Sequence, residues 1–575
     1  MIEKMSKYAF ILLGKDRSDF IEALSALGVV DIRRSAKPCD AASAALLTEI
    51  GEAKTRAAQI RAGKDDKLSA LEGKLQEAQA ALNAAAPWGD YDREQLLALG
   101  LPLHYHRVKE KQFREEWTAE VPLQKVRCEN GECWFVTLGE GDTLPGTLPA
   151  PAMTLSAAKA ACDEAQAAVS AYQAELEAKK ADLPAMDADI AAKERELAHM
   201  LAALAGKDEA EGQLLVYEGF APAAQDPALA AAFDALPCLW LREAAAESDN
   251  PPIALKNNRF ARLFEPLTGM YGMPVYGEFD PTPVLAPFFL LFFALCMGDA
   301  GYGLVLILFG IAVSKGWVKI EMFKNIGPLI SVLGCATLVV GLVLGTAFGV
   351  NLYRLDAIPE GMKQWMISDD VKIAGYSSQM VLALAIGIFH ICLAMVIKAV
   401  LFTKRFGFRQ TISTWGWVVL VLGALTTAGL SLFAGLDASL LRALIIGIGG
   451  VSALAIFIFN KPGRNPLLNI GAGLWDSYQM STGLLGDVLS YIRLYALGLA
   501  GGMLGGAFND LALMVLGEGP TWQWLPFVLI LLFGHILNLL MSCLGAFVHP
   551  LRLTFVEYFK NAGYEGKGLK YNPIK

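Results

Sequence analysis

Apolar residues are distributed unevenly along this chain of 575 residues, and this asymmetry constrains its fold more than any other feature. Up to about Phe279 the sequence is charged and rich in alanine, whereas long apolar runs follow. A membrane-spanning helix needs about 20 apolar residues, and several of the later runs reach that length. The whole chain, with a mean hydropathy of +0.40, is too apolar for one soluble globule. We therefore expect an α+β soluble half followed by an all-α polytopic membrane half.

Composition and short motifs exclude several classes of protein. The net charge of −8 gives no support for nucleic-acid binding. The N-terminus MIEKMSKYAF lacks the apolar core and the cleavage site of a signal peptide, so we expect the N-terminal half to be cytoplasmic. No GxxxxGK(S/T) phosphate-binding loop occurs, and the nine cysteines show neither zinc spacing nor a disulfide framework. We therefore expect no ATP site, no cofactor and no metal in this chain.

Two short segments of the N-terminal half predict strand–helix–strand units. The first comprises strand Tyr8–Leu13, helix Arg17–Leu27 and strand Val29–Arg33. The second comprises strand Gly212–Pro222, helix Pro227–Leu236 and a strand around Cys238–Leu241. We expect them to pack together as one membrane-proximal lobe, formed by residues 1–40 and 207–262.

Long stretches rich in Ala, Leu, Glu, Lys and Gln lie between these two units. They predict one helix over Ala41–Ala85 and another over about Leu155–Ala205, which Pro184 breaks or kinks. Neither helix is apolar enough to be buried on all sides. We expect residues 41–87 and 154–206 to form a long antiparallel helical hairpin arm; two independent solvated helices are the alternative.

Residues 88–153, between the two long helices, predict a distal α/β lobe. Its segment VRCENGECWFV alternates around Asn130-Gly131, which is a strong β-hairpin signal. Cys128 and Cys133 flank this turn, but no second pair completes a four-ligand metal site. We therefore expect residues 1–262 to form a cytoplasmic arm without a metal.

After a Pro- and Gly-rich linker (residues 263–283), residues 284–560 predict a membrane domain, and residues 561–575 a cytoplasmic tail. The apolar runs on either side of GDAGYG form one over-long span or a hairpin of two short ones, and Asp299 is expected to cap that turn. The clearer spans are Ile326–Val350, Met380–Phe402, Ile412–Phe433, Leu441–Phe459, one within 467–516, and Trp524–Val548 continuing to about Lys560.

Basic residues decide between seven and eight spans. They follow the GDAGYG pair, the fourth and sixth spans and the last helix: Lys315, Lys319, Lys324, Lys404, Arg405, Arg409, Lys461, Arg464, Arg552, Lys560, Lys567, Lys570 and Lys575. These segments fall on one side only if GDAGYG joins two helices. By the positive-inside rule, we expect about eight spans with both termini in the cytoplasm.

Arg493 stands inside the apolar stretch GLLGDVLSYIRLYALGLAGG. A charge at bilayer depth costs at least about 2.5–3.5 kcal/mol, so it marks a functional site by default. At helical spacing its face is lined by small residues, which allow another helix to come close: Gly486, Ser490, Ala496, Ala500 and Ala507. The alternative is a lipid-facing arginine that reaches the headgroups.

The last apolar helix carries a continuous polar face. His535, Asn538, Ser542, Gly545, His549 and Arg552 follow one another at helical spacing. Because polar groups in lipid need partners, this face must contact protein or water. Asp487 lies off the Arg493 face, where it pairs with a neighbouring helix or lines a cavity, and His390 of the fourth span is a further candidate functional residue.

Three segments resemble the membrane subunit a, also called subunit I, of V-type and A-type rotary ATPases. SYIRLYALGLA matches the family pattern around Arg493, FEPLTGMYGMPVYGEFDPTPVLAPFF matches the run before the first membrane helix, and HPLRLTFVEYF contains His549, Arg552 and Glu557. The strong resemblance covers residues 262–575. One departure is Ser542, which stands where eukaryotic members have a glutamate.

The resemblance implies the static half of a rotary ion pump, with Arg493 facing the rotor. The other residues expected to take part in ion translocation are Arg552, His535, Asn538, Ser542, His549, Ser490, Asp487 and Glu557. The implied partners are a rotor ring of small membrane subunits, peripheral-stalk subunits, a central-stalk adaptor and the lipid bilayer. The alternatives are a secondary transporter, for which no inverted repeat is seen, and a membrane scaffold with a coiled-coil domain.

Overall fold

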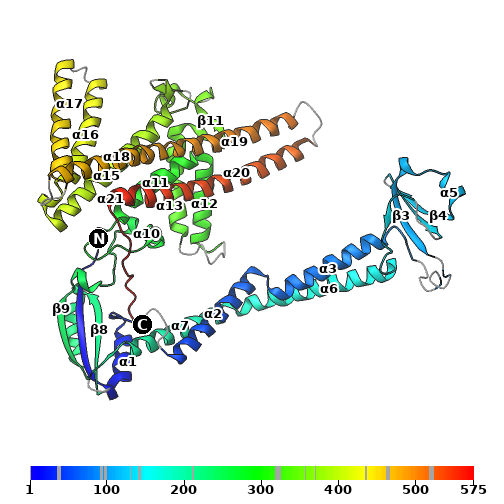
Figure 1. Cartoon of the computed structure of the whole chain (residues 1–575), viewed down its shortest axis with the longest axis horizontal. Coiled ribbons are helices and arrows are strands. Elements are labelled where there is room, and N and C mark those ends of the chain that lie inside the picture. The colour runs from blue at the N-terminus through cyan, green and yellow to red at the C-terminus, as the bar shows by residue number, and fades with distance from the viewer. Residues whose placement is uncertain are drawn as a thin grey trace. The chain divides into compact units, whose positions relative to one another are not determined.

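The computed structural model describes residues 2–34, 40–90, 95, 100, 102–129, 131–139, 144–209, 213–317, 326–356, 358–369, 371–373, 375–433, 437–460, 466–516 and 523–574 (Figure 1). The chain divides into two compact units. The first comprises Met1–Phe10, Val29–Asp31 and Glu218–Pro573, and the second Ile11–Gly28, Ile32–Tyr217 and Ile574–Lys575. Of the residues used above, Asn130, Lys319, Lys324, Lys461, Arg464 and Lys575 lie outside the described ranges.

The two predicted strand–helix–strand segments contribute to one sheet. Its strands have the order β2-β8-β1-β9, with β7 paired to β8. The elements are β1 (Met5–Leu13), α1 (Arg17–Leu27), β2 (Asp31–Ile32), β7 (Lys207–Glu209), β8 (Leu214–Pro222), α8 (Asp226–Phe233) and β9 (Leu239–Ala244). The buried rings of Tyr8 and Phe10 pack against Phe233, with centroid distances of 5.2 and 5.0 Å. These contacts confirm the predicted strands and helices.

The long helical stretches of the second unit are each broken once. The prediction of a single helix over Ala41–Ala85 is wrong: α2 (Ala41–Ala62) ends at Gly63, whose φ of 61° is left-handed, and α3 (Asp66–Ala85) begins after Asp65. The Asp65 carboxylate accepts the Leu68 N–H at 2.8 Å and so caps α3. The predicted break at Pro184 is confirmed, because α6 (Leu155–Lys179) and α7 (Leu183–Leu204) are separate helices.

The four helices pack in two pairs. α2 contacts α7, and α3 contacts α6, which lie side by side in Figure 1. Between α3 and α6 the buried residues are Leu68, Val169 and Leu176. The Tyr172 hydroxyl of α6 donates a hydrogen bond of 2.6 Å to the Asp65 carboxylate, so the cap of α3 is also tied to its partner helix.

Residues 102–148 form a second sheet with strand order β4-β5-β3-β6. Its elements are β3 (Leu103–Lys109), α5 (Trp117–Glu120), β4 (Leu123–Glu129), β5 (Glu132–Leu138) and β6 (Thr147–Leu148). β4 and β5 form the predicted antiparallel hairpin. Cys128 and Cys133 are direct cross-strand partners and form a disulfide, so the expectation that the cysteines show no disulfide pairing is wrong at this position.

The rest of the first unit is mainly helical. Before the membrane helices lie α9 (Arg259–Arg262) and α10 (Glu265–Tyr271). The apolar helices are α11 (Thr282–Met297), α12 (Ala300–Ser314), α13 (Gly327–Leu344), α15 (Ser378–Phe406), α16 (Ile412–Phe433), α17 (Ala438–Ala453), α18 (Pro466–Ser490), α19 (Ile492–Leu516), α20 (Trp524–Arg552) and α21 (Phe559–Ala562). Short elements connect α13 to α15: β10 (Thr346–Ala347), β11 (Val350–Asn351), α14 (Glu360–Lys363), β12 (Lys372–Ile373) and β13 (Tyr376–Ser377).

Six stretches of the described chain are long and apolar enough to cross a membrane: 327–344, 378–406, 412–431, 438–458, 469–516 and 524–562. α11 and α12 are apolar as well, but they have only 16 and 15 residues. They are separate helices, because Gly298 is left-handed and Asp299 caps α12. The second half is thus helical, as predicted.

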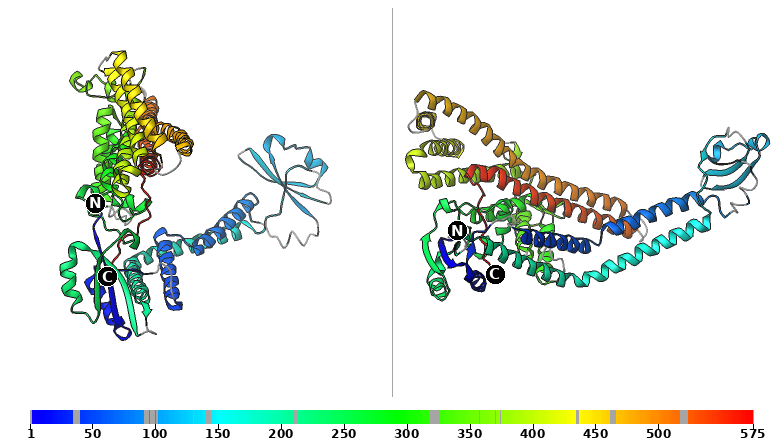
Figure 2. Two further views of the ribbon diagram at one scale, coloured as in Figure 1. Left: turned by 60° about the vertical axis from the view of Figure 1, so that its left-hand side comes forward. Right: turned by 60° about the horizontal axis from the view of Figure 1, so that its bottom comes forward.

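α11 lies at the centre of the membrane helices. It packs against α13, α19 and α20, and nearly all residues of its second half are buried. α19 and α20 lie side by side in both views of Figure 2. The shared core includes Phe289, Phe292, Tyr491 and Tyr558.

The segment after α21 packs against the segment before α11. The Gly568 N–H donates to the Met273 carbonyl at 2.8 Å, and the Tyr564 hydroxyl donates to the Gly272 carbonyl at 2.7 Å. The Glu278 carboxylate accepts the Glu565 N–H at 3.2 Å, and burial raises the pKa of this carboxyl above its ordinary value. The predicted tail therefore joins the end of the last helix to the predicted linker.

Candidate functional site

Arg493 lies in the first turn of α19, directly after a break in the predicted span. α18 ends at Ser490 and α19 begins at Ile492, so Tyr491 is a single-residue interruption of the apolar stretch 469–516. The fully buried Tyr491 ring packs against α15 at Gly387, where a Cβ atom would clash with it. The Tyr491 hydroxyl bonds His390 Nδ1 at 2.9 Å.

The Arg493 guanidinium is only partly compensated by this chain. Its Nη1 atom is buried and has no hydrogen-bond partner among the described residues. Cys296 of α11 and His549 of α20 lie near this charge, and neither carries a carboxylate. On the Arg493 face, Ala496 and Ala500 are exposed, and a Cβ atom at Gly486 would meet nothing within 4 Å. Small residues therefore alternate there with larger exposed side chains such as Leu489 and Leu504.

Part of the polar face of α20 forms a closed hydrogen-bond network with α12 and α19. His535 bonds the Tyr302 hydroxyl at 2.8 Å and Asn509 Oδ1 at 3.0 Å. The Asn538 amide donates to the Tyr302 hydroxyl at 2.9 Å and to the Gly501 carbonyl at 2.8 Å. Ser542 donates to Asn538 Oδ1 at 3.3 Å. This group of residues is called the upper network below.

The carboxylate of Asp299, next to the upper network, accepts hydrogen bonds from backbone N–H groups. It accepts the Tyr302 N–H at 3.1 Å and the Phe348 and Gly349 N–H groups at 2.8 Å each. Three backbone N–H groups thus occupy this carboxylate. The prediction that Asp299 caps the turn is confirmed, and the same residue also holds the loop after α13.

A second polar group, called the lower cluster below, lies where α18 meets the end of the chain's last helix. Asp487 is 8% exposed; its carboxylate is 3.3 Å from Lys560 Nζ and accepts the Asn561 amide at 2.8 Å. Glu557 is 2% exposed, and its Oε2 atom has no hydrogen-bond partner in the described part of the chain. Ser490 and Arg552 lie close enough to act on Glu557. Of the two alternatives for Asp487, the structure supports pairing with a neighbouring helix.

His390 lies in an aromatic cage rather than on an open path. It is fully buried, stacks on Tyr558 at 4.5 Å and contacts Phe288 at 4.2 Å between ring centroids. Its Nε2 atom and the Tyr558 hydroxyl have no hydrogen-bond partner within the described ranges. His390 therefore connects Tyr491, at the helix break, to the residue that follows Glu557.

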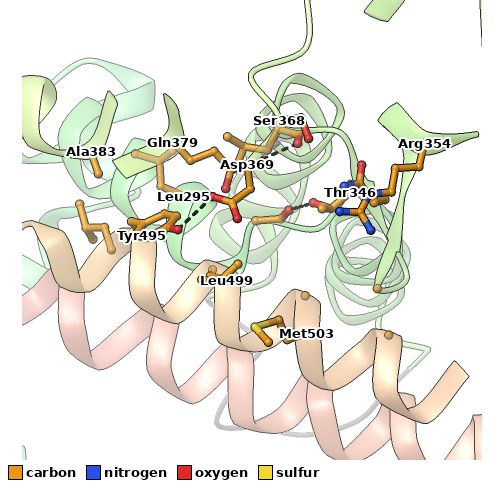
Figure 3. Close-up of a pocket in the computed structure, with 18 residues that line it drawn as sticks. Leu295, Thr346, Arg354, Ser368, Asp369, Gln379, Ala383, Tyr495, Leu499 and Met503 are labelled. Atoms are coloured by element: carbon orange, nitrogen blue, oxygen red, sulfur yellow. Dashed lines mark hydrogen bonds between the residues drawn. The ribbon is translucent and has the colours of Figure 1, made fainter. Parts of the chain in front are cut away.

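A cavity of about 410 Å³ lies beside α19 on the side of the loop between α13 and α15 (Figure 3). The α19 wall includes Leu494, Tyr495 and the glycines Gly498, Gly502 and Gly506. The opposite wall contributes polar groups from Asn351, Arg354, Ser368, Asp369 and Gln379. The Tyr495 hydroxyl donates to Asp369 Oδ1 at 2.9 Å.

Comparison with known proteins finds a similar family. The sequence model of the V-type ATPase 116kDa subunit family matches residues 156–325. A-type ATP synthase subunit I of Methanocaldococcus jannaschii is 32% identical over 354 residues, which cover 57% of this chain and 50% of the relative. The chain is therefore similar to this family over part of its length. The subunit I proteins of Pyrococcus abyssi (A-type) and Treponema pallidum (V-type, subunit I 1) are 33% and 31% identical over 57% of this chain and 48% and 52% of the relatives.

This V-type ATPase subunit family is the one that the sequence motifs resembled, so that resemblance is confirmed. The chain spans about half the length of the curated relatives it matches. With six long apolar helices among its described residues, the chain is a multi-pass membrane protein.

The structure groups the predicted site residues into separate environments. His535, Asn538 and Ser542 belong to the upper network, whereas Asp487, Ser490 and Glu557 belong to the lower cluster. Arg493 and His549 lie between them, and Arg552 is exposed near Glu557.

Sequence reasoning missed several partners of these residues: Tyr302, Asn509, Tyr491, Tyr495, Asp369 and Lys560. Tyr302 carried a signal, since it lies in the GDAGYG turn that was singled out for its charge. The others are single polar residues in or near apolar helices, which helical periodicity alone does not pair.

Proposed function

We propose that this chain is the stator membrane subunit of a rotary V/A-type ATPase, in which it carries the ion path against the rotor ring. The observation that carries the proposal is Arg493: a partly buried guanidinium whose Nη1 atom has no hydrogen-bond partner among the described residues, on a helix face that includes the exposed Ala496 and Ala500. The similarity to the V-type ATPase 116kDa subunit family and the apolar helices support the same conclusion.

The chemistry follows from the cost of charge in lipid. A carboxylate on a rotating partner crosses the bilayer only when it is neutral, either protonated or occupied by a cation. A fixed guanidinium favours the ionised carboxylate and releases the ion at one position of the rotation. The same positive charge repels cations and so prevents a direct leak between the two sides. An arginine suits this role better than a lysine, because it keeps its charge when buried.

Two half-channels then load and unload the rotor from opposite sides. We assign the lower cluster, with Asp487, Ser490 and Glu557, to the cytoplasmic side, together with His549 and Arg552. We place the upper network, with His535, Asn538 and Ser542, beside the half-channel of the other side, where it holds α20 in position. The carboxylates of the lower cluster supply groups that can exchange protons, and the ion is a proton or a sodium ion.

The membrane domain (residues 284–560) has about eight helices in this proposal, with both termini in the cytoplasm. The separation of α11 from α12 supports two short helices rather than one long span. The paired helices α2/α7 and α3/α6 form the arm, and the sheet of residues 102–148 lies in its distal lobe (residues 88–153), which binds peripheral-stalk subunits. The arm opposes the torque of the rotor, and a central-stalk adaptor completes the complex.

The test is ATP-driven ion uptake into vesicles that contain the assembled complex. Arg493→Ala and Arg493→Gln are expected to abolish uptake without preventing assembly, because both replacements are easier to insert than arginine. Arg493→Lys should also lose most of the uptake. Arg442→Ala is the matched control, since Arg442 is an exposed arginine of the apolar helix α17. Near-normal uptake by Arg493→Ala would refute the proposed function.

A further inference from the structure

The cavity beside α19 reaches the level of Arg493. Its lining begins at Leu494 and Tyr495, the two residues after Arg493, and continues along three glycines spaced four residues apart, Gly498, Gly502 and Gly506. With no side chains on these glycines, the wall of α19 stays open over more than two turns. A volume of about 410 Å³ is well above the 10–15 Å³ that one water molecule requires, so the cavity can hold a connected group of waters.

Asp369 is the only carboxylate among the described residues that line this cavity. It is half-buried, and Figure 3 shows its carboxylate beside Tyr495, whereas Arg354 lies beside Thr346. The hydrogen bond from Tyr495 leaves other lone pairs of the carboxylate open to water or a cation. Tyr495 thus holds this carboxylate at nearly the same height along α19 as Arg493, but on a different face of the helix.

The other polar groups near this part of α19 are less suited than Asp369 to bind a cation. The Asp299 carboxylate is occupied by three backbone N–H groups. The sequence of α20 from His535 to His549 contains no acidic residue. The upper network therefore offers hydrogen bonds but no negative charge, whereas the neighbouring cavity has one.

We infer that Asp369 is the ion-relay carboxylate of the non-cytoplasmic half-channel, and that the cavity holds a hydrated monovalent cation or a protonated water chain on its way to the rotor. This inference rests on the proposed function and on the proposed orientation of the membrane domain. A carboxylate at this place offsets the repulsion that Arg493 exerts on an approaching cation. The loop between α13 and α15 thereby supplies the negative charge that α20 lacks.

Ion uptake by the assembled complex tests the relay. We expect Asp369→Asn to lower ATP-driven uptake at least tenfold and Asp369→Glu to retain a measurable part of it. Asp356→Asn is the matched control, because Asp356 is an exposed aspartate of the same loop that does not line the cavity. If Arg493→Ala abolishes uptake while Asp369→Asn transports like the unmodified complex, the inference is wrong and the proposed function stands. Normal uptake by both variants would refute both.

Thiol labelling tests the cavity without relying on transport. In a variant with Cys335→Ser, cysteines at Leu499 and Gly502 should react at least fivefold faster with a membrane-impermeant reagent from the non-cytoplasmic side than a cysteine at Leu511. Leu511 lies on the same helix, is 49% exposed and does not line the cavity. Equal rates at the three positions, or reaction from the cytoplasmic side only, would overturn the assignment of this cavity to the non-cytoplasmic path.

Discussion

The upper network and the lower cluster are both polar, but they satisfy their polar atoms differently. In the upper network the side chains of Tyr302, His535 and Asn538 bond one another and the backbone. Around the lower cluster, Glu557 Oε2, Tyr558 Oη and His390 Nε2 are buried and have no partner in the described parts of the chain. The hydrogen bonds of the upper network hold helices together. The buried polar atoms around the lower cluster remain available to water or to a transported ion.

The two arrangements contribute differently to the free energy of folding. A hydrogen bond inside a protein contributes about 0.5–1.5 kcal/mol, but a buried polar atom without a partner costs about 1–3 kcal/mol. Three such atoms in neighbouring residues are therefore expensive unless water or a transported ion reaches them. We interpret the upper network as structural support for α20 and the lower cluster as the place where protons or ions are exchanged.

Replacement of Glu557 by glutamine should separate transport from stability and gives the largest expected effect. The amide occupies the same space but cannot titrate, and it removes a buried charge that is only partly compensated. We expect Glu557→Gln to lower ATP-driven uptake by about tenfold or more, within the range for loss of a proton-transfer group. The thermal stability of the purified complex should stay equal or rise slightly.

Glu565→Gln is the matched control for this variant. Glu565 lies shortly after the last helix, and its carboxylate is 58% exposed and paired with Lys567 at 3.4 Å. Its replacement should change neither uptake nor stability, because exposed ion pairs contribute little. A stability loss in Glu557→Gln with normal uptake would mean that the lower cluster is structural, and the contrast with the upper network would disappear.

Asn538→Leu should have the opposite pattern and a smaller effect on transport. Leucine has a similar size, but it leaves the Gly501 carbonyl without its side-chain donor and removes one donor from Tyr302. We expect a stability loss of about 1–3 kcal/mol, measured as a lower melting temperature in detergent, while uptake per folded complex stays within about twofold.

Leu540→Met is a suitable reference for that measurement, because Leu540 is 64% exposed on the same helix and such swaps cost little. If Asn538→Leu abolishes uptake while its melting temperature stays unchanged, the upper network takes part in ion transfer directly.

The sequence predicted the positions of the helices and strands better than the breaks within the long helices. Hydrophobic period and turn residues identified four strands of the first sheet, β1, β2, β8 and β9, and the β4–β5 hairpin of the second. The break at Gly63 was missed, since a glycine inside a helical pattern does not reveal whether its φ is positive. The break at Tyr491 was missed as well, because it depends on the space that Gly387 leaves on another helix.

The candidate site shows the same division. A charge or a polar stripe in an apolar helix is visible in the sequence, so Arg493 and the face of α20 could be predicted. Their partners could not, because Tyr302 and Asn538 lie 236 positions apart and meet only through tertiary packing. The environment of Asp369 was equally hidden, since its neighbour Tyr495 comes from a helix 126 positions away.

The reactivity of single cysteines along α20 should show the smallest of the expected effects. It compares water access to the upper network with water access to the helix face near Arg493. In a Cys543→Ser variant, we expect a cysteine at Gly545 to react several-fold faster with a small aqueous thiol reagent than a cysteine at Asn538. Asn538 is 1% exposed inside the upper network, whereas a Cβ atom at Gly545 meets only the His549 ring, at 3.9 Å. The nearby charges of Arg493 and Arg552 also favour the reactive thiolate there. Position 540 provides the lipid-facing reference and should react slowly despite its exposure. Equal rates at 538 and 545 would show that water reaches the whole stripe, so that the upper network would belong to the ion path as much as the lower cluster does.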